Sequence, residues 1–243
     1  MLIVNADDLG RLKIVTDRTL SCYEKRRIVA TSAMVFMEDS ERAAELALSS
    51  GIDVGLHINL SERFSTESVP VRLRDYHGEI CRFLRASKYA LLFYHPLLAG
   101  RFRYVFEAQY AEFLRLYGRP PSHLDGHQHM HLASNMLIQR ILPAGTRVRR
   151  SFSFSPGEKN FMNRWYRNAV DRCLARRHRL TDHFFALADH LTVDRLERVT
   201  ALAIEANVEL MTHPQHAGEY KFLLSDEYGE AVSRIRMAGY DAL

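Results

Sequence analysis

S-H-L-D-G-H-Q-H-M-H, the stretch from Ser122 to His131, contains four of the twelve histidines of the chain, with one aspartate and one glycine among them. Side chains alternate along an extended strand, so His123, Asp125, His127 and His129 face the same way wherever this stretch stays extended. Neutral imidazole is a good ligand for zinc, iron or nickel, and a histidine cluster is costly to bury unless something uses it. A polar surface loop or a set of hydrogen-bonded core histidines is the alternative. The density of histidines beside an aspartate favours a metal or catalytic site.

Polar side chains also follow three other short apolar runs. Asp7 and Asp8, His57, and His213 come after the runs at residues 2–4, 52–56 and 208–211. Short apolar runs that alternate with helical patterns predict a parallel sheet with right-handed crossovers. Catalytic groups gather at the C-terminal ends of such strands in an α/β barrel, so residues from both ends of the sequence would share one site. We therefore expect a single α/β domain of parallel strands over residues 1–243.

The pattern along the chain gives the expected elements. Strands are predicted at residues 2–4, 29–36, 52–56, 122–125, 147–152, 184–187 and 208–211. Helices are predicted at residues 14–27, 39–49, 104–117, 134–142, 160–177, 193–206 and 227–237. No internal repeat or linker divides the chain.

Composition excludes several classes of protein. The chain has 47% hydrophobic and 26% charged residues, which is ordinary for a soluble globular protein. Its net charge of +4 does not indicate a nucleic-acid partner. The cysteines Cys22, Cys81 and Cys173 form no C-x-x-C pair, so neither a zinc ribbon nor a disulfide framework is expected. The N-terminus does not read as a secretory signal, and the apolar stretch at 89–100 is too short to span a bilayer. We expect a cytoplasmic protein without a transmembrane segment.

Residues 61–104 interrupt the regular pattern. This long segment is predicted to be mostly irregular, with aromatic residues between its arginines at positions 72, 74, 82, 85, 101 and 103. Long loops in compact domains are commonly lids or binding loops. A solvated basic face is an equally good interpretation.

The residue types at the strand ends suit one chemistry. Two histidines and one carboxylate can hold a divalent ion and leave positions open for water and substrate. A second carboxylate that is not a ligand can take a proton from water, and a separate histidine can protonate a leaving amine.

The motifs around these residues resemble those of the YdjC/ChbG-type carbohydrate (chitooligosaccharide) deacetylases. They are N-A-D-D-L-G at Asn5–Gly10, G-L-H-I-N-L at Gly55–Leu60, H-L-D-G-H-Q-H-M-H at His123–His131 and E-L-M-T-H-P at Glu209–Pro214. The resemblance spans nearly the whole chain and implies one irregular (β/α) TIM-barrel-like domain. It also implies a metal-dependent hydrolase that removes N-acetyl groups from amino sugars. Leu9 and Gln215 depart from the pattern, where phenylalanine and a small residue are usual.

The resemblance also implies a role for each candidate residue. Asp8, His57 and His127 are expected as metal ligands. Asp7 is expected as the base that activates water, and His213 as the acid for the departing amine. A second group, expected to orient the ligands or the substrate, consists of Asn59, Asp125, His129 and His131.

The cofactor, the partners and the competing functions stay open at this level. Two histidines and an aspartate suit zinc, cobalt or nickel, while magnesium is often assigned in the family, so magnesium and zinc are both candidates. The expected partner is an N-acetylated sugar, and a homodimer is compatible with the sequence. The same ligand set serves non-haem iron(II) oxygenases, which would depend on molecular oxygen. A non-catalytic protein that binds polyanions through the arginines of 72–103 and 147–150 is the third interpretation, and its binding would depend steeply on salt.

Overall fold

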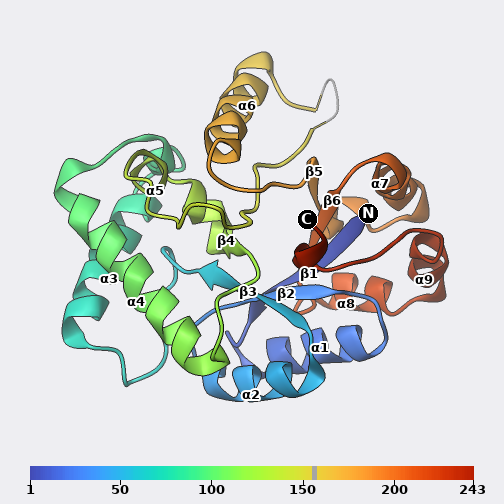
Figure 1. Cartoon of the computed structure of the whole chain (residues 1–243), viewed down its shortest axis with the longest axis horizontal. Coiled ribbons are helices and arrows are strands. Elements are labelled where there is room, and N and C mark those ends of the chain that lie inside the picture. The colour runs from blue at the N-terminus through green and yellow to red at the C-terminus, as the bar shows by residue number, and fades with distance from the viewer. Residues whose placement is uncertain (155–157) are drawn as a thin grey trace.

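The computed structural model describes residues 1–154 and 158–243, which form a sheet of six parallel strands (Figure 1). The strands are β1 (Leu2–Leu9), β2 (Ala30–Ala33), β3 (Asp53–Ile58), β4 (Leu124–Gly126), β5 (His183–Ala186) and β6 (Val208–Thr212). Their order is β4-β3-β2-β1-β6-β5, so the first strand of the chain lies near the centre of the sheet. The sheet curls into a half-barrel, which confirms the expected α/β, barrel-like fold with parallel strands.

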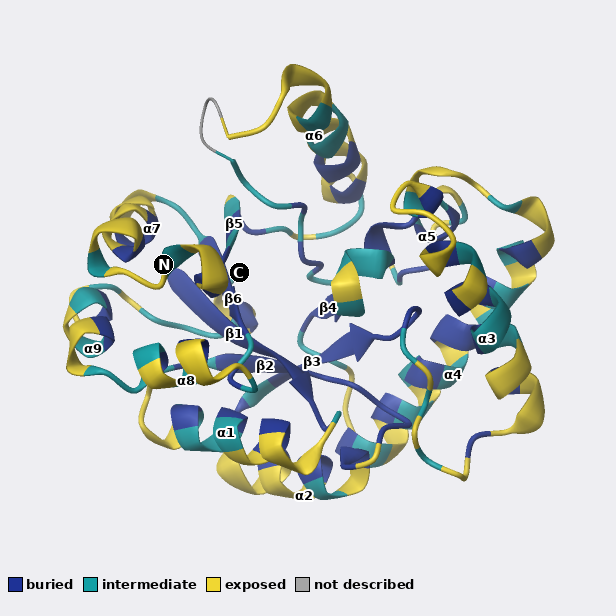
Figure 2. Cartoon of the chain, turned by 180° about the vertical axis from the view of Figure 1, so that it is seen from behind, coloured by how far each residue is buried: buried dark blue, intermediate teal, exposed yellow. Residues whose placement is uncertain are grey.

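Helices surround the outside of the half-barrel, and α6 stands away from the strands (Figure 1). They are α1 (Lys13–Glu24), α2 (Ser40–Ser50), α3 (Val71–Arg85), α4 (Ala99–Tyr117), α5 (Ser134–Ile138), α6 (Phe161–Ala175), α7 (Val193–Glu205), α8 (Ala217–Leu223) and α9 (Asp226–Val232). Short 3-10 turns occur at η1 (Ala90–Leu92), η2 (Pro96–Leu98), η3 (His127–Leu132), η4 (Leu187–His190) and η5 (Tyr240–Ala242). The strands are buried and the outer sides of the helices are exposed (Figure 2). Helix α7, for example, buries Leu196, Val199 and Ala203, which share one helical face.

Strand β1 is buried along its whole length. Its first residues, Leu2 to Val4, form the continuous apolar run that a strand covered on both faces requires. The strand continues beyond this run because its backbone pairs with β2 and β6, for instance Ala6 with Thr212. Its polar second half, which carries Asp7 and Asp8, is therefore drawn into the interior.

The segment 61–104 is more regular than the sequence predicted. Helix α3 occupies residues 71–85, and α4 begins at Ala99 instead of residue 104. The buried residues of α3 recur at helical spacing, at Leu73, His77, Ile80, Cys81 and Leu84. Four exposed arginines lie between or beside these positions, so the helical spacing of the buried residues is not evident from the sequence. The expectation of a mostly irregular insertion is therefore wrong.

The predicted strand at 147–152 is absent from the sheet. Val148 makes only an isolated bridge with Leu124, and Arg147 makes another with Arg179. The ladder stops because the backbone of Ser151 donates to the Asp171 carboxylate, 2.9 Å away, instead of to a neighbouring strand. Residues 147–149 still run along the edge of β4.

Other element boundaries differ by a few residues or by a break. The predicted strand 29–36 is limited to β2, and the predicted helix 134–142 is limited to α5. The predicted closing helix 227–237 is replaced by α9, which ends at Val232, with α8 before it. Within residues 1–154 and 158–243, the structure has no helix of the length and apolarity needed to cross a membrane.

Candidate metal centre and active site

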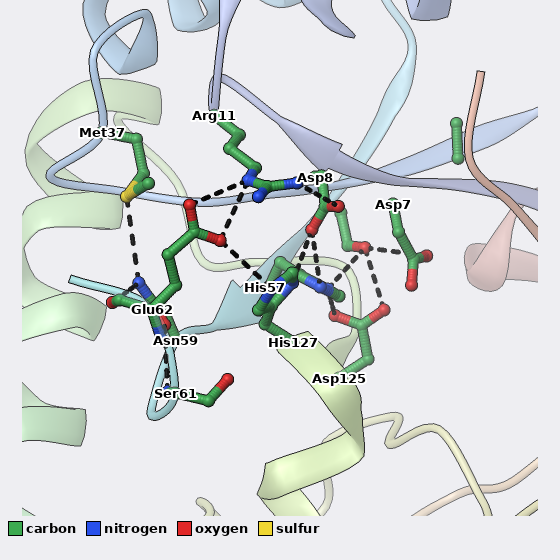
Figure 3. A network of polar contacts seen from close by, with 12 residues as sticks. Asp7, Asp8, Arg11, Met37, His57, Asn59, Ser61, Glu62, Asp125 and His127 are labelled. Atoms are coloured by element: carbon green, nitrogen blue, oxygen red, sulfur yellow. Dashed lines mark hydrogen bonds and ion pairs between the residues drawn. The ribbon is translucent and has the colours of Figure 1, made fainter. Parts of the chain in front are cut away.

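One carboxylate and two imidazoles converge at the C-terminal edge of the sheet (Figure 3). Asp8, His57 and His127 each offer a ligand atom, and these atoms all lie within 4.8 Å of one another. Asp8 Oδ1 is 3.2 Å from His57 Nε2 and 2.9 Å from His127 Nδ1. Asp8 and His57 are buried, whereas His127 is partly exposed. Three of the four strand ends that the sequence predicted to meet, those with Asp8, His57 and His127, do meet here.

The backbone aims these side chains. Asp8 has a φ of 69°, a left-handed conformation that is unusual for a residue with a side chain, where the ladder between β1 and β2 is irregular. Such irregularities re-aim a side chain, and they often occur beside functional sites. His57 lies on β3 in register with Asp125 on β4. His127 begins η3, immediately after β4 ends.

His57 is held by its Nδ1 atom. Asp125 Oδ1 is 2.8 Å from Nδ1, and Ser32 Oγ is 3.1 Å from it. This arrangement leaves Nε2 to face Asp8, as in sites where a carboxylate fixes the tautomer of a metal-binding histidine. Burial lowers the pKa of His57, but the carboxylates of Asp125 and Asp7 outweigh burial and raise it to about 10. A divalent cation bound here would have to displace a proton from this imidazole.

Asp8 is anionic in this environment. Burial raises its pKa, but hydrogen bonds from His127 and His57 outweigh burial and hold the pKa well below its usual value. Its second oxygen, Oδ2, accepts a hydrogen bond of 3.2 Å from Gln215 Nε2. Gln215, one of the two departures from the family pattern, thus ties the loop after β6 to this carboxylate.

A buried arginine joins three carboxylates next to the histidines. Arg149 is 0% exposed, and its guanidinium forms two bonds of 2.7 Å with the two oxygens of Asp7. It also lies 2.8 Å from Asp125 Oδ2 and 2.5 Å from Glu209 Oε1. The sequence placed Arg149 only among the arginines 147–150 of the polyanion-binding interpretation, not at this site. Its place within a predicted strand, 147–152, was the available signal, because arginine is almost never fully buried unless it is paired.

Asp7 is the carboxylate that this arginine orients. Burial raises the pKa of Asp7, but the Arg149 guanidinium and His57 together outweigh burial, and the net pKa lies below the usual value. Asn5 Nδ2 also donates to Asp7 Oδ1 over 2.9 Å. Asp7 is therefore an ionised, fixed carboxylate in a buried position beside the His57 cluster.

His213 follows β6, the neighbour of β1. The last paired residues of these strands are Ala6 and Thr212, so His213 leaves the sheet beside Asp7. Its backbone N–H donates to Glu219 Oε2 over 2.8 Å, and its Nδ1 is 3.8 Å from Glu219 Oε1. The imidazole is partly exposed, in contrast to the buried His57.

Glu62 is a second residue that the sequence analysis missed. Its Oε2 atom is 3.2 Å from His127 Nε2 and 3.0 Å from Arg11 Nε (Figure 3). The side chain of Asn59 shapes the turn that carries Glu62: Asn59 Oδ1 accepts from the Glu62 N–H, and Asn59 Nδ2 donates to the Glu62 carbonyl. No pattern of spacing marked Glu62, because it lies in a turn rather than at a strand end.

The later histidines of the motif turn away from the cluster. The extended conformation ends after β4, and His129 has a φ of 59°. Its ring packs edge-on against Phe152 and Phe184. His131 Nε2 lies 3.0 Å from the carbonyl oxygen of Arg149. His131 thus contacts the backbone of the residue that orients Asp7, and the alternation predicted from His123 to His129 stops short of His129.

The donor chemistry fits a divalent cation best at Asp8, His57 and His127. One carboxylate with two imidazoles is a common set for zinc and its neighbours. Among the described residues, two other sets have donors equally close together: Asp7, His57 and Asp125, and His213, His216 and Glu219. In the first set, Asp7 and Asp125 are already paired with the Arg149 guanidinium, which would repel a cation. In the second, Glu219 Oε2 is already engaged by the hydroxyl of Thr212 and the His213 N–H.

Replacing Glu62 by glutamine is expected to weaken metal binding about 10–100-fold, the usual effect of losing a carboxylate that supports a ligand. Glutamine keeps the size of the side chain but removes the charge that holds the His127 ring. Calorimetric titration of the metal-free protein with Zn²⁺ measures the change. Glu67→Gln, on the exposed part of the same segment, is the matched control. If Glu62→Gln binds Zn²⁺ with unchanged affinity, Glu62 does not support the metal site and serves only as the ion-pair partner of Arg11.

Comparison with known proteins identifies relatives of the chain. The model of the YdjC-like protein family matches residues 1–234. The chitooligosaccharide deacetylase of Serratia marcescens is 32% identical over 137 residues, which are 54% of this chain and 51% of that protein. The chitooligosaccharide deacetylase of Proteus mirabilis is 31% identical over 133 residues, 54% of this chain and 50% of that protein. The chain thus matches these curated relatives over about half of their length.

The fold has a counterpart among solved structures. A protein of Enterococcus faecalis V583, provisionally described as a cellobiose-phosphate cleavage protein, superposes with a TM-score of 0.70. The superposition covers 99% of this chain and 97% of that one, at 18% sequence identity. At this identity the likeness concerns the architecture alone, and it covers the whole half-barrel.

Proposed function

Because this chain belongs to the YdjC-like family, we propose that it is a carbohydrate N-deacetylase, a metal-dependent amidohydrolase that removes an acetyl group from an amino sugar. The observation that carries the proposal is the convergence of Asp8, His57 and His127 beside a separate carboxylate, Asp7, fixed by Arg149. A metal-dependent hydrolase of this kind uses both a cation site and a base that is not itself a ligand of the cation.

The cation would be held by Asp8, His57 and His127. When bound, a divalent ion supplies Lewis acidity to an amide carbonyl and to water. The two imidazoles favour zinc, cobalt or nickel, while magnesium prefers sites that are richer in oxygen. We therefore propose zinc ahead of magnesium as the metal of this site.

Asp7 is the proposed base. It accepts a proton from the water whose oxygen forms the new bond to the acetyl carbon. Asp7 Oδ1 accepts from both Arg149 and Asn5, whereas, among the described residues, Oδ2 accepts only from Arg149. Each carboxylate oxygen has two lone-pair directions, so acceptor capacity is left on Oδ2. The guanidinium keeps Asp7 ionised at neutral pH and fixes its direction, which is what a positioned base requires.

His213 is the proposed acid. It gives a proton to the sugar nitrogen as the bond between that nitrogen and the acetyl carbon breaks, and the products are acetate and a free amine. Its partly exposed position at the end of β6 lets it reach a substrate from the open side of the half-barrel. Glu219, which accepts from the His213 backbone and lies near Nδ1, sets the orientation of the ring.

The test is acetate release from a panel of N-acetylated sugars, with and without chelator, and then with Zn²⁺, Mg²⁺, Co²⁺ or Ni²⁺ restored. We expect release that chelator abolishes and an added metal restores. Acetate release that is unaffected by complete removal of metal would overturn the metal requirement. Turnover of a substrate only in the presence of iron and molecular oxygen would assign the site to the oxygenase class instead.

A further inference from the structure

Helix α6 carries large apolar side chains on its outer side. Phe161, Met162 and Trp165 are 74%, 66% and 59% exposed. Scattered apolar residues are normal on a protein surface, but three together on one turn of a helix mark an interaction site. The buried residues of α6 are Val170, Asp171 and Leu174, on the opposite side of the helix.

The same outer side of α6 is strongly cationic. Phe161, Trp165, Arg172 and Arg176 follow one another at helical spacing, so they form one stripe about 22 Å long at 1.5 Å per residue. Arg164, Arg172 and Arg176 are all exposed. We call Phe161, Met162, Arg164, Trp165, Arg172 and Arg176 the α6 face.

Negative charge is scarce in the sequence around α6. There is no acidic residue between Asp125 and Glu158, and between residues 159 and 181 there is only Asp171. Asp171 is buried and pairs with Arg150, 2.9 Å away, so it does not neutralise the α6 face. The face therefore combines an excess of positive charge with apolar side chains.

Helix α5 and the residues after it also expose an apolar and a cationic side chain near α6. Residues of α5 and the C-terminal half of α6 line a common cavity of 160 Å³, so these parts of the two helices lie near each other. At the end of α5, Ile138 is 62% exposed, and Arg140, two residues further on, is exposed as well. Figure 2 shows α6 projecting from the body of the molecule, with its outer side exposed.

We propose that the α6 face binds the surface of a lipid bilayer that contains anionic lipids. A helix with tryptophan, phenylalanine and other apolar residues beside arginines is the composition of helices that lie in the membrane interface. The arginines meet the anionic headgroups, and Trp165 and Phe161 enter the boundary between headgroups and acyl chains.

Two other occupants fit the chemistry less well. Nucleic acid would engage the arginines and stack on the aromatic rings, but it gives the aliphatic side chains of Met162 and Ile138 no apolar partner. A second copy of the chain packed on this face would bury its arginines, and the α6 face has no carboxylate to pair with them. The bilayer offers both an apolar layer and negative charge.

Vesicle binding tests the proposal with the full chain and does not depend on any enzymatic activity. Vesicles of phosphatidylcholine are compared with vesicles that also contain phosphatidylglycerol. Trp165 is the single tryptophan of the protein, so its fluorescence reports directly on this face. We expect sedimentation with the anionic vesicles, a blue shift of the Trp165 emission and release by high salt.

Matched variants locate the binding. The double variant Arg172→Gln, Arg176→Gln is expected to bind about 30-fold more weakly. Each arginine near an anionic surface strengthens binding about 5–6-fold, and the variant loses two of them. The control is Arg198→Gln with Ile204→Ala on α7, an exposed arginine and an isoleucine that is 73% exposed, and it should bind as the unaltered chain does.

Several outcomes would overturn the proposal. These are the absence of vesicle binding at low salt, an equal loss in the α7 control, or an unchanged Trp165 emission despite sedimentation. Binding of an RNA or DNA oligonucleotide without vesicle binding would assign the face to nucleic acid. A concentration-dependent dimer that the α6 substitutions abolish, again without vesicle binding, would assign it to a second copy.

Discussion

Asp7→Asn is expected to lower turnover by about 10²–10⁴-fold, the usual contribution of a general base, while the protein still binds its metal. Asparagine has nearly the same shape as aspartate, but its amide cannot accept the proton of the attacking water. The proposed ligands Asp8, His57 and His127 remain in place, so metal affinity should change little. Turnover on a substrate identified by acetate release and calorimetric metal binding measure the two effects separately.

The control for this substitution is Asp17→Asn, an exposed aspartate on α1 whose partner is Arg42. It should retain both turnover and metal binding. Near-normal turnover in Asp7→Asn would show that the base is another group, and Asp125 is the nearest candidate because it shares the Arg149 guanidinium. Loss of metal together with turnover would instead place Asp7 among the ligands.

The central cluster could be predicted because it depends on one simple rule. Asp8 and His57 lie at the C-terminal ends of β1 and β3, and His127 directly follows β4. Parallel strands of one sheet deliver their C-terminal ends to the same edge. That rule needs only the strand positions to within a few residues. Errors such as ending the first strand at Val4, when β1 continues to Leu9, therefore did no harm.

Arg149 and Glu62 could not be found in this way because neither lies at the end of a sheet strand. Arg149 reaches the interior through a segment that makes only isolated bridges, and its position depends on the Leu124 carbonyl accepting a hydrogen bond from its backbone N–H. Glu62 is placed by the side chain of Asn59, which fixes a turn through two hydrogen bonds. Contacts that no periodic pattern records decide both positions.

The helix α3 was missed for a different reason. Its buried positions include His77 and Cys81, which are not read as strongly apolar, and its exposed side is crowded with arginines. The buried His77 is hydrogen-bonded to the backbone of Asn59, 3.1 Å away, so the helix supports the turn that carries Glu62. The arginine-rich segment thus supports the site indirectly, through the contact of His77 with the backbone of Asn59.

Arg149→Met is expected to destabilise the protein by about 3–5 kcal/mol, the usual result of removing one partner of a buried ion pair. Methionine fills much of the space, but Asp7, Asp125 and Glu209 would be left buried without their cation. For a chain of this size the loss corresponds to a fall in Tm of about 6–20 °C. Thermal unfolding followed by circular dichroism measures it, with Arg198→Met on α7 as the exposed control.

The dependence on pH separates this cause from simple loss of packing. In the unaltered chain burial raises the pKa of Asp7 and Asp125, but Arg149 and His57 together outweigh burial and hold both pKa values below the usual value. The contribution of these two carboxylates to stability is therefore present at neutral pH. It is lost as the pH falls below about 4 and passes through their lowered folded-state pKa values. In Arg149→Met burial acts without opposition from the guanidinium, so the folded-state pKa values rise. The variant should then be least stable at neutral pH and should recover as the carboxylates protonate on acidification. A stability deficit that is the same at pH 7 and pH 5 would mean that packing, not charge, is what Arg149 supplies.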